Sequence, residues 1–279
     1  MSNHSVDKLH DRFAFGENWS DYASRIDETH VAEAVDGLRR LLGGGDLRGS
    51  SFLDIGCGSG VHAVAALRLG AERVHAIDFD PKSVETTRAT LARFCPGAAW
   101  TVERRSVFDL DPEADGRYDV VYSWGVLHHT GDMHAALRAA AALVPGGGRF
   151  VFALYRRTVL CPAWKVEKRW YANATPKAQA RARNFIVGLK RMAFAMAGRD
   201  FGAYVDGYKA RRGMLFEQDM HDWLGGWPYE SISPAAVHRA MSRLGLVRER
   251  EFAKGGYFLG MRWTEFGSAC DEYVYARPR

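Results

Sequence analysis

Short apolar runs alternate with stretches of helical spacing between residues 51 and 154. This alternation is typical of a parallel sheet in which a helix connects each strand to the next. The apolar runs predict strands at Ser51–Ile55, Arg73–Asp78, Trp100–Val107, Asp119–Trp124 and Arg149–Leu154. The helical stretches are Val61–Leu69, Lys82–Phe94 and Asp132–Leu143, the last with Asp132 as its N-cap and Pro145-Gly146-Gly147-Gly148 as its stop signal. We therefore expect five strands of a doubly wound α/β sheet.

The same pattern returns near the end of the sequence. A helix is predicted over Pro234–Leu244, opened by Ser233, and strands are predicted at Val247–Phe252 and Asp271–Ala276. Because the connection between these strands contains Gly255-Gly256 and Gly260, they are expected to form an antiparallel pair at one edge of the sheet. A further amphipathic helix, about Glu28–Leu42, precedes the first strand.

Residues 155–233 break the alternation and are predicted to be an inserted, mainly helical segment. Apolar residues recur there at helical spacing, namely Phe185, Ile186, Leu189, Met192, Ala193 and Met196. Basic residues fall elsewhere on the turn, so an amphipathic helix with a basic face is expected. The predicted organisation is an N-terminal helical cap (1–50), a core (51–154), the inserted segment acting as a lid (155–233), and the end of the core (234–279).

Composition agrees with a globular protein, since 47% of the 279 residues are hydrophobic and 25% are charged. Collagen-like, coiled-coil and wholly disordered classes are thereby excluded. The sequence contains no apolar run of transmembrane length and no signal-peptide pattern at its start, so a cytoplasmic location is expected. The cysteines Cys57, Cys95, Cys161 and Cys270 lie far apart, which predicts free thiols and no metal site.

The strongest local signal is the run Phe52 to Gly60, FLDIGCGSG, in which a strand enters a glycine-rich turn that opens a helix. Glycines allow positive φ and close approach of a ligand to the backbone. In the dinucleotide pattern GxGxxG the third glycine falls where this chain has Val61, and the P-loop lysine is also missing. The turn therefore indicates an adenosine-type ligand without choosing one.

A second acid, Asp78, ends the next predicted strand, 24 residues after Asp54. A carboxylate at that strand end can accept both ribose hydroxyls of an adenosine. A nicotinamide dinucleotide and S-adenosylmethionine both satisfy this feature. The second ligand carries positive charge at its sulfonium and its ammonium, so it tolerates a nearby acid such as Asp54 better than a pyrophosphate does.

The runs DIGCGSG (54–60), Asp78 and YDVVYSW (118–124) resemble the class I S-adenosylmethionine-dependent methyltransferases, especially the ubiquinone/menaquinone-biosynthesis-like group. The resemblance covers about residues 51–154 and implies a Rossmann-like, seven-stranded sheet with an antiparallel last strand. It also implies that Gly56, Cys57 and Gly58 approach the methionine part and that Asp78 holds the ribose. Phe79 would then lie beside the adenine, with Ser106 and Val107 at its edge. The residues expected to bind the cofactor are Asp54, Gly56, Cys57, Gly58, Gly60, Asp78, Phe79, Ser106, Val107, Ser123, Trp124 and Trp19.

Members of the family often carry Gly-Asp where this chain has Arg105-Ser106. The polar contact to the adenine amino group is therefore expected from Ser106 or Asp109. Trp19, in the N-terminal segment, is expected to close over the cofactor, with simple helix packing as the alternative.

Methyl transfer is an in-line displacement, so a general base is needed only for an acceptor that arrives protonated. His128 and His129 follow the fourth predicted strand, at the carboxyl edge where open α/β sheets bind ligands. An imidazole titrates near neutral pH, which makes His129, and then His128, candidate bases. Family members with a similar Leu-His-His favour a structural role for both. Asp222, beside an aromatic cluster of Trp223, Trp227 and Tyr229, is the third catalytic candidate, with a helix cap in a packed turn as its alternative.

The formal net charge is +5, yet residues 156–212 contain fourteen Lys or Arg and three acids. Four explanations of this basic segment remain open. It is a solvated helix face, a site for an acidic or phosphorylated small substrate, a nucleic-acid surface, or a membrane surface. A recognisable RNA module is absent from the sequence, and the apolar face of the predicted helix lacks tryptophan, so neither nucleic acid nor stable membrane insertion is expected.

The sequence therefore predicts an S-adenosylmethionine-dependent methyltransferase that acts on an O or N atom of a small metabolite of secondary-metabolite, sugar or quinone/phenol type, releases S-adenosylhomocysteine, and exists as a monomer or homodimer. The alternatives are an RNA methyltransferase, a non-catalytic adenosyl-ligand-binding regulatory protein, and a nicotinamide oxidoreductase. Neither the acceptor atom nor the substrate is identified by any motif.

Overall fold

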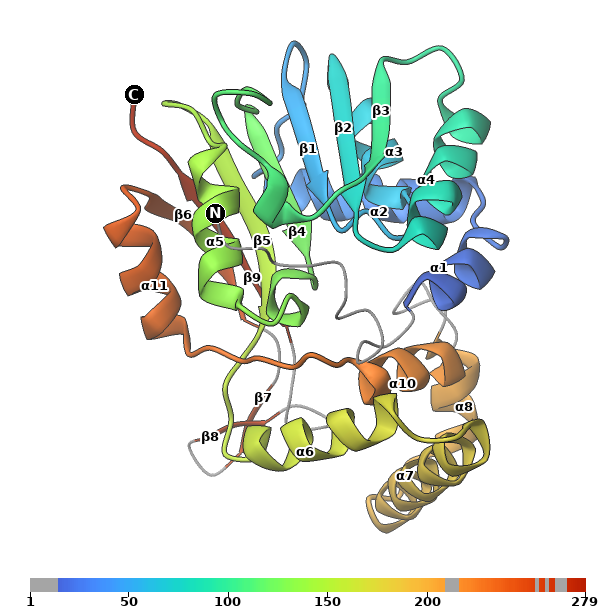
Figure 1. The fold of residues 1–279 in the computed structure, drawn as a ribbon. Coiled ribbons are helices and arrows are strands. Elements are labelled where there is room, and N and C mark those ends of the chain that lie inside the picture. Colours follow the sequence, from blue (N-terminus) through green and yellow to red (C-terminus); the bar gives the residue numbers. More distant parts are fainter. Residues whose placement is uncertain (1–14, 209–215, 254–255, 259–260, 264–269) are drawn as a thin grey trace. The chain divides into compact units, whose positions relative to one another are not determined.

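The computed structural model describes residues 15–208, 216–253, 256–258, 261–263 and 270–279 (Figure 1). Among these, two compact units are distinguished. The larger unit comprises Phe15–Cys161 and Glu230–Arg279, and the smaller one Pro162–Tyr229. Because the two units pack mainly within themselves, each is described on its own.

A seven-stranded sheet in the order β3-β2-β1-β4-β5-β9-β6 forms the centre of the larger unit. Its strands are β1 (Ser51–Ile55), β2 (Arg73–Asp78), β3 (Trp100–Arg104), β4 (Val120–Trp124), β5 (Arg149–Tyr155), β6 (Val247–Phe252) and β9 (Cys270–Ala276). The first five are parallel, whereas β9 runs antiparallel to both β5 and β6. The predicted doubly wound sheet with an antiparallel last strand is thus confirmed.

Helices cover both faces of this sheet (Figure 1). They are α1 (Phe15–Ala23), α2 (Glu28–Leu41), α3 (Val61–Arg68), α4 (Pro81–Phe94), α5 (Met133–Ala142) and α11 (Pro234–Arg243), with short 3-10 turns η2 (Val107–Asp109) and η3 (Leu127–His129). Successive strand residues point to opposite faces. Phe52 therefore joins the core under α2 and α3, while Leu53 joins the core under α5 and α11.

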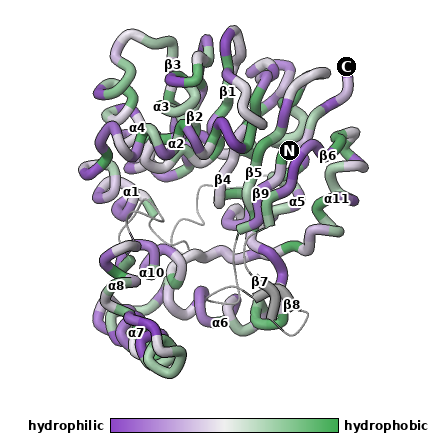
Figure 2. The backbone as a smooth tube through the Cα atoms, turned by 180° about the vertical axis from the view of Figure 1, so that it is seen from behind, coloured by the Kyte–Doolittle hydropathy of each residue, from purple (hydrophilic) through white to green (hydrophobic). Residues whose placement is uncertain are grey.

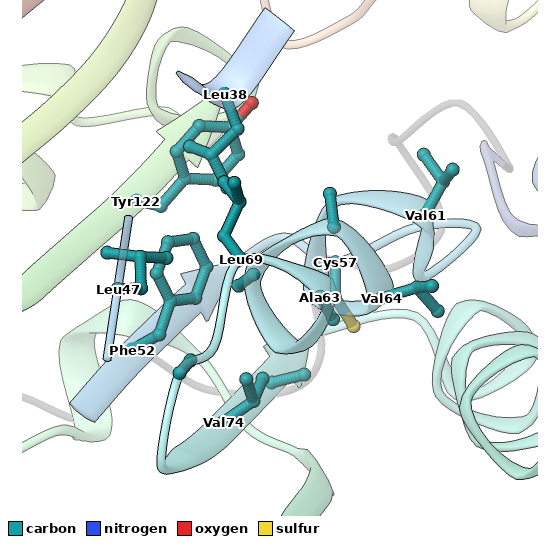
Figure 3. Close-up of a cluster of buried hydrophobic side chains, with 14 of the residues drawn as sticks. Leu38, Leu47, Phe52, Cys57, Val61, Ala63, Val64, Leu69, Val74 and Tyr122 are labelled. Carbon is teal, nitrogen blue, oxygen red and sulfur yellow. The ribbon is translucent and has the colours of Figure 1, made fainter. Parts of the chain in front are cut away.

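Figure 3 shows the first of these cores, in which Leu38 of α2 and Val64 of α3 lie with Phe52 of β1. Each of these three residues is at most 1% exposed, so close packing holds β1 in place. Because β1 leads directly into the glycine turn, this core also fixes where the turn begins.

Most predicted element boundaries agree with the structure to within a residue or two, including Asp132 and Ser233 as N-caps. One strand is shorter than predicted. β3 ends at Arg104 and not at Val107, because the Ser106 side chain caps the turn η2. The predicted connection around Gly256 also contains two short strands, β7 (Gly256–Phe258) and β8 (Met261–Trp263), which pair antiparallel. Gly255 and Gly260 lie outside the described residues.

The smaller unit is helical, with α6 (Cys161–Ala172) entering it, followed by α7 (Pro176–Met196), α8 (Phe201–Asp206) and α10 (Phe216–Gly225). Its core is aromatic: Phe194 packs on Phe201 and Tyr204, with ring centroids 5.5 and 4.8 Å apart. The apolar residues predicted to define one face of α7 do not point into this core. Phe185 is 65% exposed and Met196 is 76% exposed, whereas Lys190 is buried.

Candidate functional site

The glycine turn after β1 has a backbone that only glycine adopts readily. Gly56, Gly58 and Gly60 have φ angles of 77°, 53° and 80°. A Cβ at Gly56 would lie 2.4 Å from a methyl group of Val126, so this position also has no room for a side chain. The amides of Gly56 and Cys57 both donate to the Ile77 carbonyl, at 2.8 and 3.1 Å, which ties the turn to the end of β2.

Asp54 lies on β1 just before this turn and is 2% exposed. Among the described residues, its Oδ2 has no hydrogen-bond partner. Burial, and then the charge of Asp78, raise the pKa of this carboxyl from 3.8 to about 7. A buried carboxyl oxygen without a partner favours a cationic ligand, because a nearby positive charge would offset the cost of ionising it.

Asp78 ends β2 beside the same turn. Its Oδ2 accepts from the Gly58 amide at 3.0 Å and its Oδ1 accepts from the Asp80 amide at 2.9 Å. Burial raises its pKa to about 6 despite these two hydrogen bonds. Each carboxylate oxygen has more than one acceptor position, so Asp78 retains capacity for two ligand hydroxyl groups. Both predicted acids therefore lie at one end of the sheet, one on each side of the glycine turn.

Helix α1 packs against this region from the N-terminal side. The Gly16 amide donates to Asp80 Oδ2 at 3.0 Å, and a Cβ at Gly16 would lie 2.5 Å from that carboxylate. The Trp19 ring lies beside Gly58, 3.3 Å from the position that a Cβ would take there. The structure thus brings Trp19 to the glycine turn, and its closure over the cofactor stays a prediction.

The predicted adenine edge is formed by the start of η2. Ser106 and Asp109 cap this turn reciprocally: the Ser106 hydroxyl accepts from the Phe108 amide, and the Asp109 carboxylate accepts from the Ser106 amide. Val107 is buried, while Phe79 is half-buried after β2. Arg105, where family members often carry glycine, forms a bidentate ion pair with Asp115 at 2.5 and 2.8 Å. That pair fixes the loop that carries Ser106.

Ser123, Trp124 and Cys57 each make a contact within the protein. The Ser123 hydroxyl is fully buried and donates to the Ile55 carbonyl at 3.0 Å. The Cys57 thiol accepts from Thr87 at 3.2 Å, and burial raises the pKa of the thiol well above its usual value. Trp124 donates its indole N–H to Glu272 at 3.0 Å. These contacts stabilise the edge of the sheet at which the glycine turn lies.

Two residues of this edge were missed from the sequence. Glu272 is 4% exposed and accepts from Trp124 and, at 2.8 Å, from Arg40. His62 lies with its ring centroid 5.1 Å from that of Tyr122 and 6.5 Å from that of Trp124, and burial lowers its pKa to about 4. An acid inside a predicted strand of the sheet is a detectable signal for Glu272, since a buried carboxylate requires partners.

His128 and His129 belong to an aromatic group at the carboxyl ends of β4 and β5. The ring centroid of His128 lies 4.3 Å from that of His129 and 4.2 Å from that of Tyr155. His128 is fully buried, whereas His129 is half-buried and its ring centroid lies 5.4 Å from that of Phe15 in α1. Of the two, His129 is therefore the one that a ligand at this edge can reach.

Asp222 lies in α10 of the smaller unit, among aromatic residues. Trp223 packs edge-on against Trp164, with ring centroids 4.6 Å apart, and the buried Lys168 ammonium lies 4.2 Å from the centroid of the Trp223 ring. The neighbouring His221 is hydrogen-bonded to Tyr171, with Nδ1 and the hydroxyl oxygen 2.8 Å apart. Its pKa is lowered by burial and then by Arg183. This cluster belongs to a different unit from the glycine turn.

The residues that the structure describes include no group of three or more His, Cys, Asp or Glu side chains arranged to hold a metal ion. None of the helices in this part of the chain has the length and apolar character needed to cross a bilayer.

The site fits S-adenosylmethionine by its two carboxyl groups, which accept hydrogen bonds. The buried Asp54 carboxyl oxygen, which has no partner in the described part of the chain, suits the ligand's positive charge, and Asp78 suits its ribose hydroxyls.

Three known proteins illustrate what this chain is similar to. Ubiquinone biosynthesis O-methyltransferase of Xanthomonas euvesicatoria is 34% identical over 142 residues, which are 50% of this chain and 58% of that protein. The magnesium protoporphyrin IX methyltransferase of Synechocystis PCC 6803, solved with bound SAH, has a TM-score of 0.52 at 17% identity, with 89% of this chain and 83% of that chain covered. An O-methyltransferase family protein of Burkholderia thailandensis has a TM-score of 0.53 at 13% identity, with 94% and 59% covered.

At these identities the solved structures support the fold alone, and the match spans little more than half the length of the curated relatives. The family itself is established by a family model described as a methyltransferase domain, which matches residues 25–244. Because that match extends over most of the sequence, the chain belongs to the methyltransferase-domain family, and the resemblance to class I S-adenosylmethionine-dependent methyltransferases predicted from the sequence is confirmed.

Proposed function

We propose that this protein transfers a methyl group from S-adenosylmethionine to an oxygen or nitrogen atom of a small molecule. The observation that carries this proposal is the pair of acids at the glycine turn: Asp54 Oδ2 is buried and finds no partner among the described residues, and Asp78 is held by two backbone amides. A dinucleotide would bring its negative pyrophosphate to the same turn, beside an acid that already resists ionisation.

When bound, the cofactor supplies an electrophilic methyl group. The residues of this chain then have three tasks. Asp54 offsets the positive charge of the ligand, and Asp78 accepts from the ribose hydroxyls. Trp19, which lies beside Gly58, excludes water from the methionine side. These roles account for the residues gathered at the turn without requiring a metal ion.

His129 is the proposed general base for a protonated acceptor. Its ring is half-buried and lies against Phe15 and Tyr155, with centroids 5.4 and 5.5 Å away. A hydroxyl or amine acceptor releases a proton as the new bond forms, and a neutral imidazole at this edge can take it. His128 supports this role by positioning, since it is fully buried between His129 and Tyr155. Asp222, the third catalytic candidate from the sequence, stays a prediction.

A phenolic oxygen is the proposed acceptor group. The curated relatives that match half of this chain are named ubiquinone biosynthesis O-methyltransferases, which supports a hydroxylated ring as the acceptor. The half-buried rings of His129, Tyr155 and Phe15 offer flat surfaces for such a ring.

The reaction is tested by incubating the protein and methyl-labelled S-adenosylmethionine with a cell extract separated beforehand into metabolite and RNA fractions. Label in a metabolite supports the proposal and identifies the acceptor by its mass. Label in RNA contradicts it in favour of an RNA methyltransferase. Cofactor binding without transfer to either fraction favours a regulatory adenosyl-ligand-binding protein.

The role of His129 is tested by His129→Asn, with His134→Asn as the matched control on the exposed surface of α5. If His129 is the base, its variant loses turnover at neutral pH and recovers part of it as the pH rises and the acceptor ionises. The control keeps the wild-type pH profile. An unchanged profile for His129→Asn would remove the proposed base.

A further inference from the structure

Helix α7 has an unusual distribution of apolar residues. Phe185, Leu189, Met192 and Met196, here called the α7 stripe, follow one another at intervals of four, three and four residues and therefore share one face. They are 65%, 43%, 54% and 76% exposed. In a helix that packs on its own protein, such residues are the ones that face inward.

The opposite side of α7 faces the core of the smaller unit. Lys190 is 8% exposed and donates to the Tyr204 hydroxyl at 2.8 Å, while its ammonium lies 4.4 Å from the centroid of the Tyr204 ring. Phe194, also buried, packs beside it on Tyr204. Since a buried lysine fixes the rotation of the helix, the outward direction of the α7 stripe is set by specific contacts of the described residues.

Charge distinguishes this helix further. Its 21 residues contain five Lys or Arg and no Asp or Glu. Lys177 and Arg181 are exposed and precede Phe185 at intervals of four residues, so the cations continue along the edge of the α7 stripe. The hydropathy colouring in Figure 2 shows purple and green residues mixed along α7.

A second exposed apolar pair occurs in the same unit. Val166 and Trp170 of α6 are 72% and 51% exposed and lie one turn apart. Lys165 and Arg169 are exposed next to them. Tryptophan is enriched at membrane interfaces, and the predicted amphipathic helix contains none. Trp170 of α6 supplies one in the same unit.

We propose that the α7 stripe is a docking surface for an anionic lipid membrane, on which the helix lies parallel to the surface. Apolar side chains enter the boundary between headgroups and acyl chains, and the flanking cations bind lipid headgroups. An RNA surface would need the cations but would gain nothing from four exposed apolar side chains. A docked helix of this kind is peripheral, in agreement with the finding that no described helix can span a bilayer.

The experiment is co-sedimentation of the full chain with two kinds of vesicle, one of phosphatidylcholine mixed with phosphatidylglycerol and one of phosphatidylcholine alone. Binding to the mixed vesicles is expected, with much weaker binding to the neutral ones and to mixed vesicles at high salt. Phe185→Ser with Met196→Ser is expected to lower the partition coefficient about tenfold or more. Lys177→Gln with Arg181→Gln is expected to lower it by about tenfold.

Val247→Ser is the matched apolar control, because Val247 is 59% exposed on β6 of the larger unit. Arg243→Gln, on the exposed surface of α11, is the matched charge control. Both are expected to bind vesicles like the wild type. Since all substituted residues are exposed, the unfolding midpoints of the variants should agree with that of the wild type. The variant with Lys177→Gln and Arg181→Gln also tests the proposal without removing an apolar side chain.

Several outcomes would overturn the proposal. They are an absence of vesicle binding, equal binding to neutral and anionic vesicles, and wild-type binding by both α7 variants. A homodimer in light scattering that the serine variant dissociates, without any vesicle binding, would assign the α7 stripe to a second copy of the chain. Binding of RNA that the glutamine variant weakens and the serine variant does not would assign the cations to nucleic acid.

Discussion

Replacing Asp54 by asparagine tests two effects of this buried acid separately. One is its effect on the free energy of unfolding, and the other is its effect on ligand binding. The pKa of Asp54 is raised from 3.8 to about 7 because the carboxyl is buried and lies near Asp78. The folded protein therefore holds a proton on Asp54 up to about pH 7, whereas the unfolded chain releases it near pH 3.8. The stability that this proton contributes is fully present below the unfolded pKa and is lost as the pH rises through the folded pKa.

The magnitude follows from these two pKa values. Between about pH 5 and about pH 8, proton linkage at Asp54 lowers the free energy of unfolding by about 2.5 kcal/mol. The Asp54→Asn variant cannot ionise, so its free energy of unfolding should depend on pH less than that of the wild type, by about this amount. Denaturant unfolding of the ligand-free protein at the two pH values measures the difference.

The same substitution, which removes the loss of stability at high pH, should weaken ligand binding. Without the carboxylate, S-adenosylhomocysteine, which carries the ammonium and no sulfonium, should bind about 10- to 100-fold more weakly at about pH 8. Calorimetric titration of S-adenosylhomocysteine and S-adenosylmethionine compares the two cations. An equal loss for both ligands assigns Asp54 to the ammonium, and a larger loss for S-adenosylmethionine assigns it to the sulfonium as well. Unchanged affinity for both, or an unchanged pH dependence of stability, would refute the reasoning.

Four further predictions concern single positions in the larger unit. Gly56→Ala should cost about 2 kcal/mol or more in denaturant unfolding, because φ is 77° and the new Cβ meets Val126; Gly44→Ala, with φ 90° and open space around it, should cost only about 1 kcal/mol, and equal losses would contradict the packing argument. Glu272→Gln should destabilise by about 1–3 kcal/mol and shift the Trp124 fluorescence, since the carboxylate pairs with Arg40 and Trp124; an unchanged spectrum would exclude its role in holding the indole. Asp132→Ala should cost about 1 kcal/mol through the lost N-cap of α5, with thermal unfolding as the measurement. His62 should show no imidazole titration by NMR above about pH 5.5, because burial lowers its pKa to about 4.

Local pattern was sufficient for most of the fold. Periodicity identified each strand of the main sheet, and Ser233 and Asp132 were found as caps because an N-cap is a local feature of sequence. The glycine turn and the acids Asp54 and Asp78 were also found locally, since each lies at the end of a recognisable strand. Boundaries failed where a side chain intervened: Ser106 ends β3 early by capping η2. The short pair β7 and β8 lacked a recognisable periodic signal, because alternation with a period of two residues needs four or more residues to be detected.

The tertiary structure decided what no local pattern contains, namely which distant residues meet. Glu272 lies 148 positions from Trp124, yet their side chains form a hydrogen bond because β9 inserts beside β5. Trp19 reaches Gly58 because the Gly16 amide of α1 donates a hydrogen bond to Asp80 at the start of α4. Periodicity likewise identified the apolar side of α7 but not its direction, which depends on where Lys190 and Phe194 find aromatic partners. Sequence thus determined elements and motifs, which depend on neighbours along the chain, while burial and orientation depend on contacts that only the folded chain creates.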